Sequence, residues 1–163
     1  MAAWLLLLAT AASATDCSAT PGAASDCRVL AVNDGDTVTL SCQEAGLRRV
    51  RVRVWGIDAP EIGQRPWGEL AQQRLRELAS DRVTLQPVDK DDYGRLVGRL
   101  HRGNEDLGLT LVREGYARVY RRFNESPVYR QAEREARSQR RGVWSRPGDQ
   151  QTPWRWRRTH PRQ

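Results

Sequence analysis

The chain of 163 residues has few histidines and cysteines, the usual zinc ligands, and few long apolar runs of the kind that span a membrane. It contains two histidines and three cysteines, and no two cysteines have the C-x-x-C spacing, so a zinc site is not expected. Beyond residues 1–14, no run is apolar enough to cross a bilayer. The length suits one ordinary domain with a core of its own.

Lysine is almost absent, because Lys90 is the only one in a chain whose net charge is +7. From Arg113 onward there are 14 arginines and five acidic residues, a net charge of +9, whereas the first 112 residues carry −2. Arginine donates planar, paired hydrogen bonds that suit phosphate, although a GC-rich genome would give the same bias. No strongly amphipathic basic helix with an aromatic face appears, which favours nucleic acid over a membrane surface as partner.

Residues 1–14 resemble a secretory signal peptide. An apolar run is followed by small residues that end in Ala12-Ser13-Ala14, an A-x-A cleavage pattern. The basic segment that normally precedes the apolar run is missing, and a buried N-terminal helix is the alternative. We expect a secreted or periplasmic protein, with residues 15–26 as a flexible lead-in.

Residues 27–42 carry the pattern of a β-hairpin, with two runs rich in Val, Leu and Thr around Asp34-Gly35. A two-residue turn there would place Cys27 opposite Cys42, close enough for a disulfide. A one-residue bulge would spoil that register. Cys17 is left without an assignment.

The remaining pattern predicts a small barrel with packed helices. We expect further strands at 48–57, 82–88 and 96–102, and helices at 66–80, 107–115 and from 126 to about 142. With the hairpin this makes five strands and three helices in a domain spanning residues 27–145. The tail, residues 146–163, has no periodicity and is expected to be loose.

Four acidic residues stand at turns and strand ends: Asp34, Asp36, Asp58 and Glu61. If the strands are neighbours these carboxylates converge, and their repulsion then requires a cation between them. Ligands that are all oxygen favour calcium or magnesium. Alternatively, the Asp-Gly pair only forms the turn.

Two arginines could meet a phosphate. Arg53 lies inside an apolar strand, and Arg95 begins another. A guanidinium can neutralise the charge that develops on phosphate oxygens, whereas the alternative is a surface salt bridge worth about 0–1 kcal/mol. Arg53 and Asp58 are five residues apart, so regular pleating would send them to opposite faces. Gly56 is the expected place for a bulge or a strand end that restores a common side.

Four motifs in order resemble the thermonuclease family, the staphylococcal-nuclease-like domains: NDGDT, RVWGIDAPE, DYGR and LVREGYARVYRRF. The resemblance runs from about Cys27 to Trp144. It implies an α+β OB-fold, a five-stranded β-barrel with three packed α-helices. It also implies a calcium-dependent endonuclease that hydrolyses DNA and RNA and leaves 3′-phosphate ends.

The resemblance also implies a cation site. Asp36 and Asp58 would bind calcium through their carboxylates, and Ala59 through its backbone carbonyl. Asp34 would lie just behind these ligands. Glu61 would orient or deprotonate the attacking water.

The same resemblance assigns the substrate contacts. Arg53 and Arg95 would hold the scissile phosphate and act in catalysis. Tyr93, Arg121 and Phe123 would lie beside the nucleotide, although Phe123 lacks the hydroxyl of the tyrosine that the best-known member carries nearby.

Two features differ from the family pattern. Asp92 stands where members commonly carry a lysine or arginine beside the nucleotide phosphate. The segment PWRWRR, residues 153–158, alternates aromatic rings with cations. It could stack on bases and contact phosphates, or it could be a strap that packs its tryptophans onto the barrel.

Three functions are compatible with this pattern. The first is a secreted nuclease, expected to be a monomer that favours single strands. The second is a non-catalytic OB-fold module that binds nucleic acid, and the third is an adhesion protein that binds acidic polymers. Such inactive modules usually lose carboxylates or arginines of the set, whereas this chain keeps all of them, which favours the enzyme.

Overall fold

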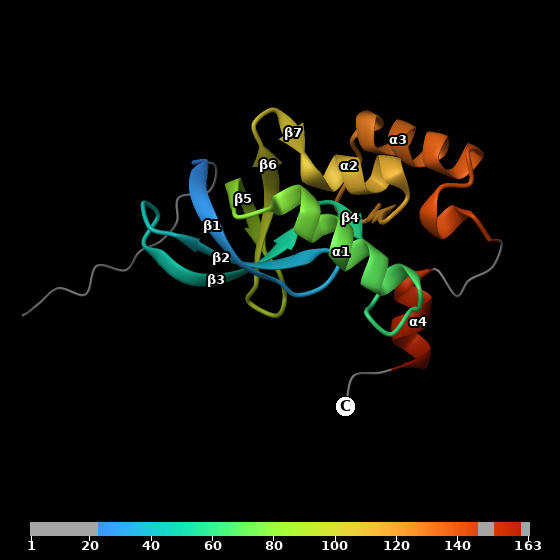
Figure 1. Ribbon diagram of the computed structural model, residues 1–163, viewed down its shortest axis with the longest axis horizontal. Helices are drawn as coiled ribbons and strands as arrows, with labels where there is room; N and C mark the ends of the chain where they lie inside the picture. The colour runs from blue at the N-terminus through green and yellow to red at the C-terminus, as the bar shows by residue number, and fades with distance from the viewer. Residues whose placement is uncertain (1–22, 147–151, 161–163) are drawn as a thin grey trace, which may run out of the picture.

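The computed structural model describes residues 23–146 and 152–160 (Figure 1). The expected signal peptide and Cys17 therefore lie outside the described residues. The strands are β1 (Ser25–Val32), β2 (Thr37–Cys42), β3 (Leu47–Val54), β4 (Ile57–Asp58), β5 (Arg82–Lys90), β6 (Leu96–Arg102), β7 (Glu105–Asp106) and β8 (Arg118–Val119). The helices are α1 (Trp67–Ala79), α2 (Leu107–Glu114), α3 (Pro127–Ser138), α4 (Pro153–Thr159) and the short 3₁₀ helix η1 (Gly142–Trp144).

Five long strands close into a barrel. They are hydrogen-bonded in the order β3-β2-β1-β5-β6, and β3 also pairs in parallel with β6, which joins the two ends of the sheet. Closure removes the free edges that a five-stranded sheet would otherwise expose. Apolar side chains fill the interior; Leu40, Val52 and Leu100 are fully buried. The expected α+β OB-fold is confirmed.

The helices cover one side of this barrel, and α2 lies against α3 (Figure 1). The carboxylate of Asp106 caps α2 by accepting from the backbone N–H of Leu109 at 3.1 Å, and α2 ends at Gly115, as expected. The expectation that α3 continues to about Gly142 is wrong. The helix ends at Ser138, because Arg140 adopts a positive φ of 52° that no α-helix continues.

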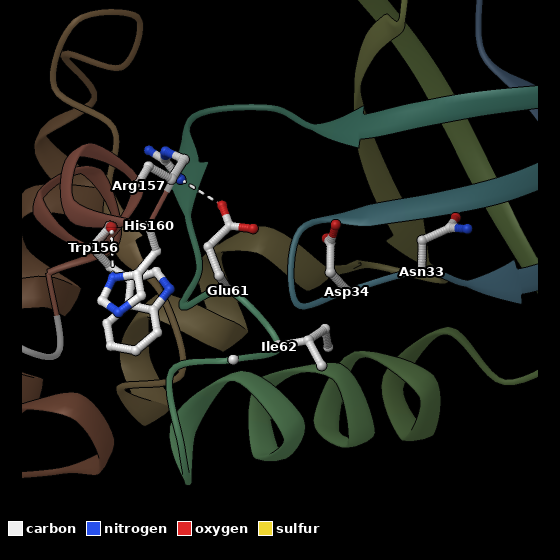
Figure 2. A pocket seen from close by; sticks show the side chains of 8 residues that line it. Asn33, Asp34, Glu61, Ile62, Trp156, Arg157 and His160 are labelled. Atoms are coloured by element: carbon white, nitrogen blue, oxygen red, sulfur yellow. Dashed lines mark hydrogen bonds and ion pairs between the residues drawn. The ribbon is translucent and has the colours of Figure 1, made fainter. Parts of the chain in front are cut away.

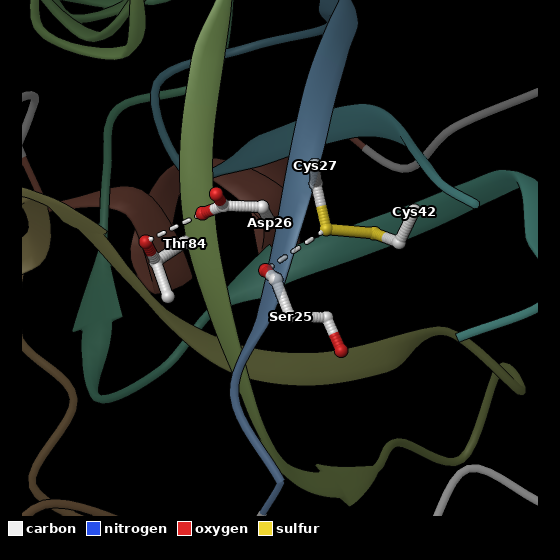
Figure 3. The surroundings of a disulfide bond; sticks show 5 residues. All are labelled: Ser25, Asp26, Cys27, Cys42 and Thr84. Atoms are coloured by element: carbon white, nitrogen blue, oxygen red, sulfur yellow. Dashed lines mark hydrogen bonds between the residues drawn. A yellow bond between two sulfur atoms is a disulfide. The ribbon is translucent and has the colours of Figure 1, made fainter. Parts of the chain in front are cut away.

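The predicted hairpin register is correct at the cysteines and wrong at the turn. The loop between β1 and β2 spans residues 33–36, with Val32 opposite Val38, one position out of the expected register. A bulge between Val29 and Ala31 then shifts the pairing back by one residue. The bulge therefore restores the register that it was expected to spoil, and the Cys27–Cys42 disulfide forms, with a Cα–Cα distance of 4.2 Å (Figure 3).

The strand ends where Gly56 was expected to interrupt it. β3 stops at Val54, and Gly56 has a φ of +74°. A Cβ at this position would lie 2.4 Å from Nδ2 of Asn124, which donates a hydrogen bond to the carbonyl of Gly56. Both the positive φ and this close approach require glycine. The turn brings Asp58 back to the side of Arg53.

The described part of the tail beyond Arg146, residues 152–160, is not loose, which corrects the expectation for that part. Residues 153–159 form α4, whose Pro153 occupies the first turn of the helix. Figure 1 shows α4 beside the loop that leads into α1. In the described parts of the chain, no helix is long and apolar enough to cross a membrane.

Candidate active site

Two buried carboxylates meet at one end of the barrel. Asp36 follows the β1–β2 loop and Asp58 ends β4, and the two residues are 5% and 4% exposed. Arg53 reaches both. Its Nη1 lies 3.0 Å from Oδ1 of Asp36, and its Nη2 lies 3.6 Å from Oδ1 of Asp58. One guanidinium therefore spans the pair, and the predicted convergence of these side chains is present.

The β1–β2 loop is tied to the strand end that carries Asp58. The backbone N–H of Ala59 donates to Oδ2 of Asp36 at 3.1 Å, and Oδ1 of Asp34 accepts from the N–H of Asp36 at 3.0 Å. Gly35 allows this approach, because a Cβ there would lie 2.7 Å from the Cβ atoms of both Ala59 and Ala71. The turn chemistry of Asp34-Gly35 thus serves the site as well as the hairpin.

Glu61 lies beside this pair and is held by an arginine from α4 (Figure 2). Arg157 donates to Oδ1 of Asp58 from both terminal nitrogens at 3.0 Å, and Nη1 also donates to Oε1 of Glu61 at 3.0 Å. The backbone N–H of Glu61 donates to the side chain of the buried Gln64 at 2.9 Å. Glu61 and Asp58 therefore share one cationic partner.

A hollow of about 320 Å³ opens next to these groups. Figure 2 shows that the β1–β2 loop, the loop after β4 and α4 each provide part of its wall. The rings of Trp156 and His160 stack on one side, 3.6 Å apart, and Asp34 lies on another. The hollow thus has an acidic side and an aromatic side.

Burial and mutual repulsion shape the electrostatics of the acids. Burial, and then the charge of Asp36, raise the pKa of Asp34 to about 6. Burial also raises the pKa of Asp58, although the hydrogen bonds and charge of Arg157 oppose the shift. For Arg53, burial lowers the pKa, but the charges of Asp36 and Asp58 raise it by more. Without the arginines, the carboxylates of Asp34, Asp36 and Asp58 would repel one another.

No three His, Cys, Asp or Glu side chains among the described residues are grouped so that they could hold a metal ion. Two guanidinium groups instead lie among the carboxylates. The donor set nevertheless suits a hard divalent cation, because the donors are carboxylate oxygens. The residues present therefore fit the expected calcium ion in chemistry.

Arg95 does not join the carboxylate cluster. It lies one residue before β6, and its Nε and Nη2 each lie 2.7 Å from Oδ2 of Asp91. Val97 of β6 pairs with Arg53 of β3, so these two side chains lie on the same face of the sheet. Successive side chains of a strand alternate between the faces, so Arg95, two residues before Val97, is on that face too. The two arginines thus lie on one face, but only Arg53 touches the acids.

The expected nucleotide residues lie at the surface of the molecule. Tyr93 is 86% exposed and Phe123 is 55% exposed, so both rings are open to solvent. Arg121 is also exposed, and its Nη2 lies 2.9 Å from Oε2 of Glu133. Neither ring is needed for the core, which leaves both available to a ligand.

Two residues at the site were missed from the sequence. The centroid of the Tyr120 ring lies 5.6 Å from the guanidinium carbon of Arg53. Tyr120 directly precedes Arg121 in the motif LVREGYARVYRRF, but it was given no role there. Arg157 was noticed only as part of the tail. The strap alternative for PWRWRR was the available signal, because a tail packed on the barrel brings its cations to the barrel's acids.

The chain matches a known family over the same region. Residues 51–146 match the family model described as staphylococcal nuclease homologue. An uncharacterized endonuclease of Escherichia coli O157:H7 is 36% identical over 132 residues, which cover 80% of this chain and 83% of that protein. A micrococcal nuclease of Shigella flexneri is 36% identical over 143 residues, covering 80% and 79%. An uncharacterized endonuclease of Haemophilus influenzae is 33% identical over 133 residues, covering 81% and 72%. The chain belongs to the staphylococcal nuclease family.

Proposed function

We propose that the chain is a calcium-dependent endonuclease that hydrolyses DNA and RNA, single strands by preference, and leaves 3′-phosphate ends. Its family makes it a nuclease, a hydrolase of phosphodiester bonds. The observation that carries the finer proposal is the meeting of Asp36, Asp58 and Glu61 around arginine side chains at one end of the barrel. An OB-fold that only bound nucleic acid would have no use for three acids at the place where a phosphate enters.

The cation would be held by the carboxylates of Asp36 and Asp58 and by the carbonyl of Ala59. When bound, it would polarise a phosphate oxygen and neutralise negative charge there. Asp34 supports the ligands from behind, because its carboxylate fixes the N–H of Asp36. A hard ion with oxygen ligands is the reason for choosing calcium.

Glu61 would take the proton from the attacking water. The water oxygen then bonds to phosphorus, the bond from phosphorus to the 5′-oxygen breaks, and the 5′-oxygen leaves and takes a proton from a solvent water. Arg53 would support this reaction from beside the two aspartates, where its side chain is 15% exposed. Arg95 would leave Asp91 and donate to the phosphate.

The exposed rings of Tyr93 and Phe123 would stack on bases. Stacking tolerates any base, so we expect little sequence preference. Single strands are favoured because their bases can turn towards such rings without breaking pairs. Arg121 would contact the backbone phosphate next to them.

Digestion of single-stranded DNA with calcium or with a chelator tests the proposal. We expect fragments with 3′-phosphate ends in calcium and intact DNA in the chelator. Tight binding of uncut DNA under both conditions would instead indicate the binding module. Fragments with 5′-phosphate ends would refute the proposed bond cleavage.

Replacing Arg95 with alanine tests the substrate contacts. We expect the rate to fall by about 10²–10³-fold, the usual cost of removing one transition-state donor. Arg82→Ala is the matched control, because Arg82 is exposed at the open end of the β5–β6 hairpin. An Arg95→Ala protein that cuts as fast as the parent would remove Arg95 from the mechanism.

We further propose export from the cytoplasm and a monomeric state. The Cys27–Cys42 disulfide supports export, because such bonds persist in oxidising compartments. Measuring the mature N-terminus of the secreted protein tests the first proposal, and light scattering in solution tests the second.

A further inference from the structure

The α4 helix places a cation of the chain itself on the acids of the proposed site. Arg157 makes three hydrogen bonds to the carboxylate of Asp58, at 3.0, 3.0 and 3.2 Å, and one to Glu61 at 3.0 Å. Asp58 is 99 residues away in the sequence, so this contact exists only because the tail returns to the barrel. The guanidinium bridges two groups, one of which would bind the cation while the other would activate water.

Contacts on either side of Arg157 hold α4 in this position. Thr152 and Pro153 are buried at the start of the helix. A Cβ built at Gly63 would lie 3.6 Å from Cζ2 of Trp156, an ordinary packing contact, and Trp156 stacks on His160 (Figure 2). The tryptophan thus lies against the loop that carries Glu61, and it aims Arg157 at the acids.

Arg157 and a divalent cation cannot both bind the carboxylate of Asp58. Arg157 lies within hydrogen-bond distance of both oxygens of Asp58, so an ion bound to either oxygen would sit against a like charge. Arg53, unlike Arg157, cannot leave the site, because its strand is paired on both sides. Arg53 itself lies opposite Thr37 of β2 and Val97 of β6. α4 has only seven residues, too few for a stable helix on its own, and can leave without opening the barrel.

We propose that α4 is an autoinhibitory strap, in which Arg157 occupies the place of the divalent cation on Asp58 and also binds Glu61, the group that would activate water. The inference rests on the proposed function, since it takes the site to be a calcium site. Calcium then binds only to molecules whose strap has opened, and its apparent affinity is reduced by the open fraction. By linkage, calcium must weaken the hold of the strap by the same factor.

Titration calorimetry of calcium into the full-length chain tests the strap. We expect Arg157→Ala to bind calcium more tightly than the parent, on the order of 5- to 150-fold, the usual range for coupled sites. Arg158→Ala is the matched control, because it removes the same charge from an exposed neighbour on the same helix. It should bind calcium as the parent does. Asp58→Asn should bind none.

Hydrogen exchange of the backbone amides of residues 154–159 gives a second readout that needs no activity; Pro153 has no N–H. In the parent, saturating calcium should speed exchange of these amides, because it displaces the strap. In Arg157→Ala the exchange should already be fast without calcium. Arg157→Lys, which keeps the charge and loses the paired donors, should lie between the two and serves if the alanine variant folds poorly.

The outcomes separate the strap from the proposed function. If Arg157→Ala and the parent bind calcium equally, the strap is refuted and the calcium site stands. If neither protein binds calcium, the proposed calcium site fails and the strap fails with it. Tighter binding in both Arg157→Ala and Arg158→Ala would show a general charge effect and would also overturn the strap.

Discussion

Replacing Arg53 with alanine would leave the two buried carboxylates at the end of the barrel without their shared strand-borne cation. Removing one partner of a buried ion pair costs about 3–5 kcal/mol, mostly because a buried charge is left uncompensated. Asp36 keeps two other donors, the hydroxyl of Thr37 and the N–H of Ala59, and Asp58 keeps Arg157. We therefore expect a loss at the lower end, about 3 kcal/mol of unfolding free energy.

Urea denaturation in the presence of a chelator measures this loss. For a domain of this size, 3 kcal/mol corresponds to a fall in Tm of roughly 10 °C. Arg51→Ala is the matched control, because Arg51 is exposed on the same strand two residues earlier. Surface substitutions of this kind usually change stability by no more than about 0.5 kcal/mol.

Adding calcium should show whether Arg53 stabilises the fold mainly through its charge or mainly through its packing. If its main role is to neutralise the two acids, calcium should restore more stability to Arg53→Ala than it adds to the parent, since binding to the folded state stabilises it. The nuclease rate should remain about 10²–10³-fold low, because a bound ion does not replace the lost donor. A chelator-treated Arg53→Ala protein that loses less than about 1 kcal/mol would refute the reasoning.

Three further changes test the fold and the site. Replacing Cys27 and Cys42 together with serine should cost about 3 kcal/mol in urea denaturation, the value for a loop of about 15 residues; an unchanged midpoint would mean that the reduced chain is already constrained. Gly56→Ala should destabilise the protein by about 1–3 kcal/mol because of the positive φ and the crowded side chain opposite, and a fully stable variant would contradict the strained turn. Glu61→Gln should slow turnover while leaving calcium affinity, measured by calorimetry, near that of the parent; a large loss of affinity would make Glu61 a ligand instead.

The barrel could be predicted from the sequence because its signals are local. Alternating apolar residues gave the strands, and the position of Gly56 gave the end of β3. The hairpin turn was misjudged for a tertiary reason. Its loop spans four residues because the carbonyl of Asp36 accepts from the N–H of Val54 at 2.8 Å, which holds the loop against β3 instead of in a tight turn. No local pattern reports that bond.

The candidate site was predicted in part. The convergence of Asp36, Asp58 and Glu61 follows from strand ends that meet, and motif resemblance pointed to the same residues. Arg95 was expected beside them, but its nearest acid is Asp91, four residues away, and a local ion pair forms in the structure. Arg157 was not assigned to the site, because the strap alternative let the tail pack on the barrel but a segment without periodicity does not show which side chain will meet which acid.

The two arginines at the acids differ in how they are anchored, and this difference decides what each can do. Arg53 belongs to the closed barrel, so its charge is a permanent part of the site and lowers the repulsion that any folded molecule must overcome. Arg157 belongs to a seven-residue helix outside the barrel, so its charge can be withdrawn. A site with one fixed cation would still repel itself when empty, and in the proposed mechanism the strap supplies the missing charge until a calcium ion replaces it. On that proposal the same acids remain compensated in both states, so the empty enzyme folds without metal and remains inactive.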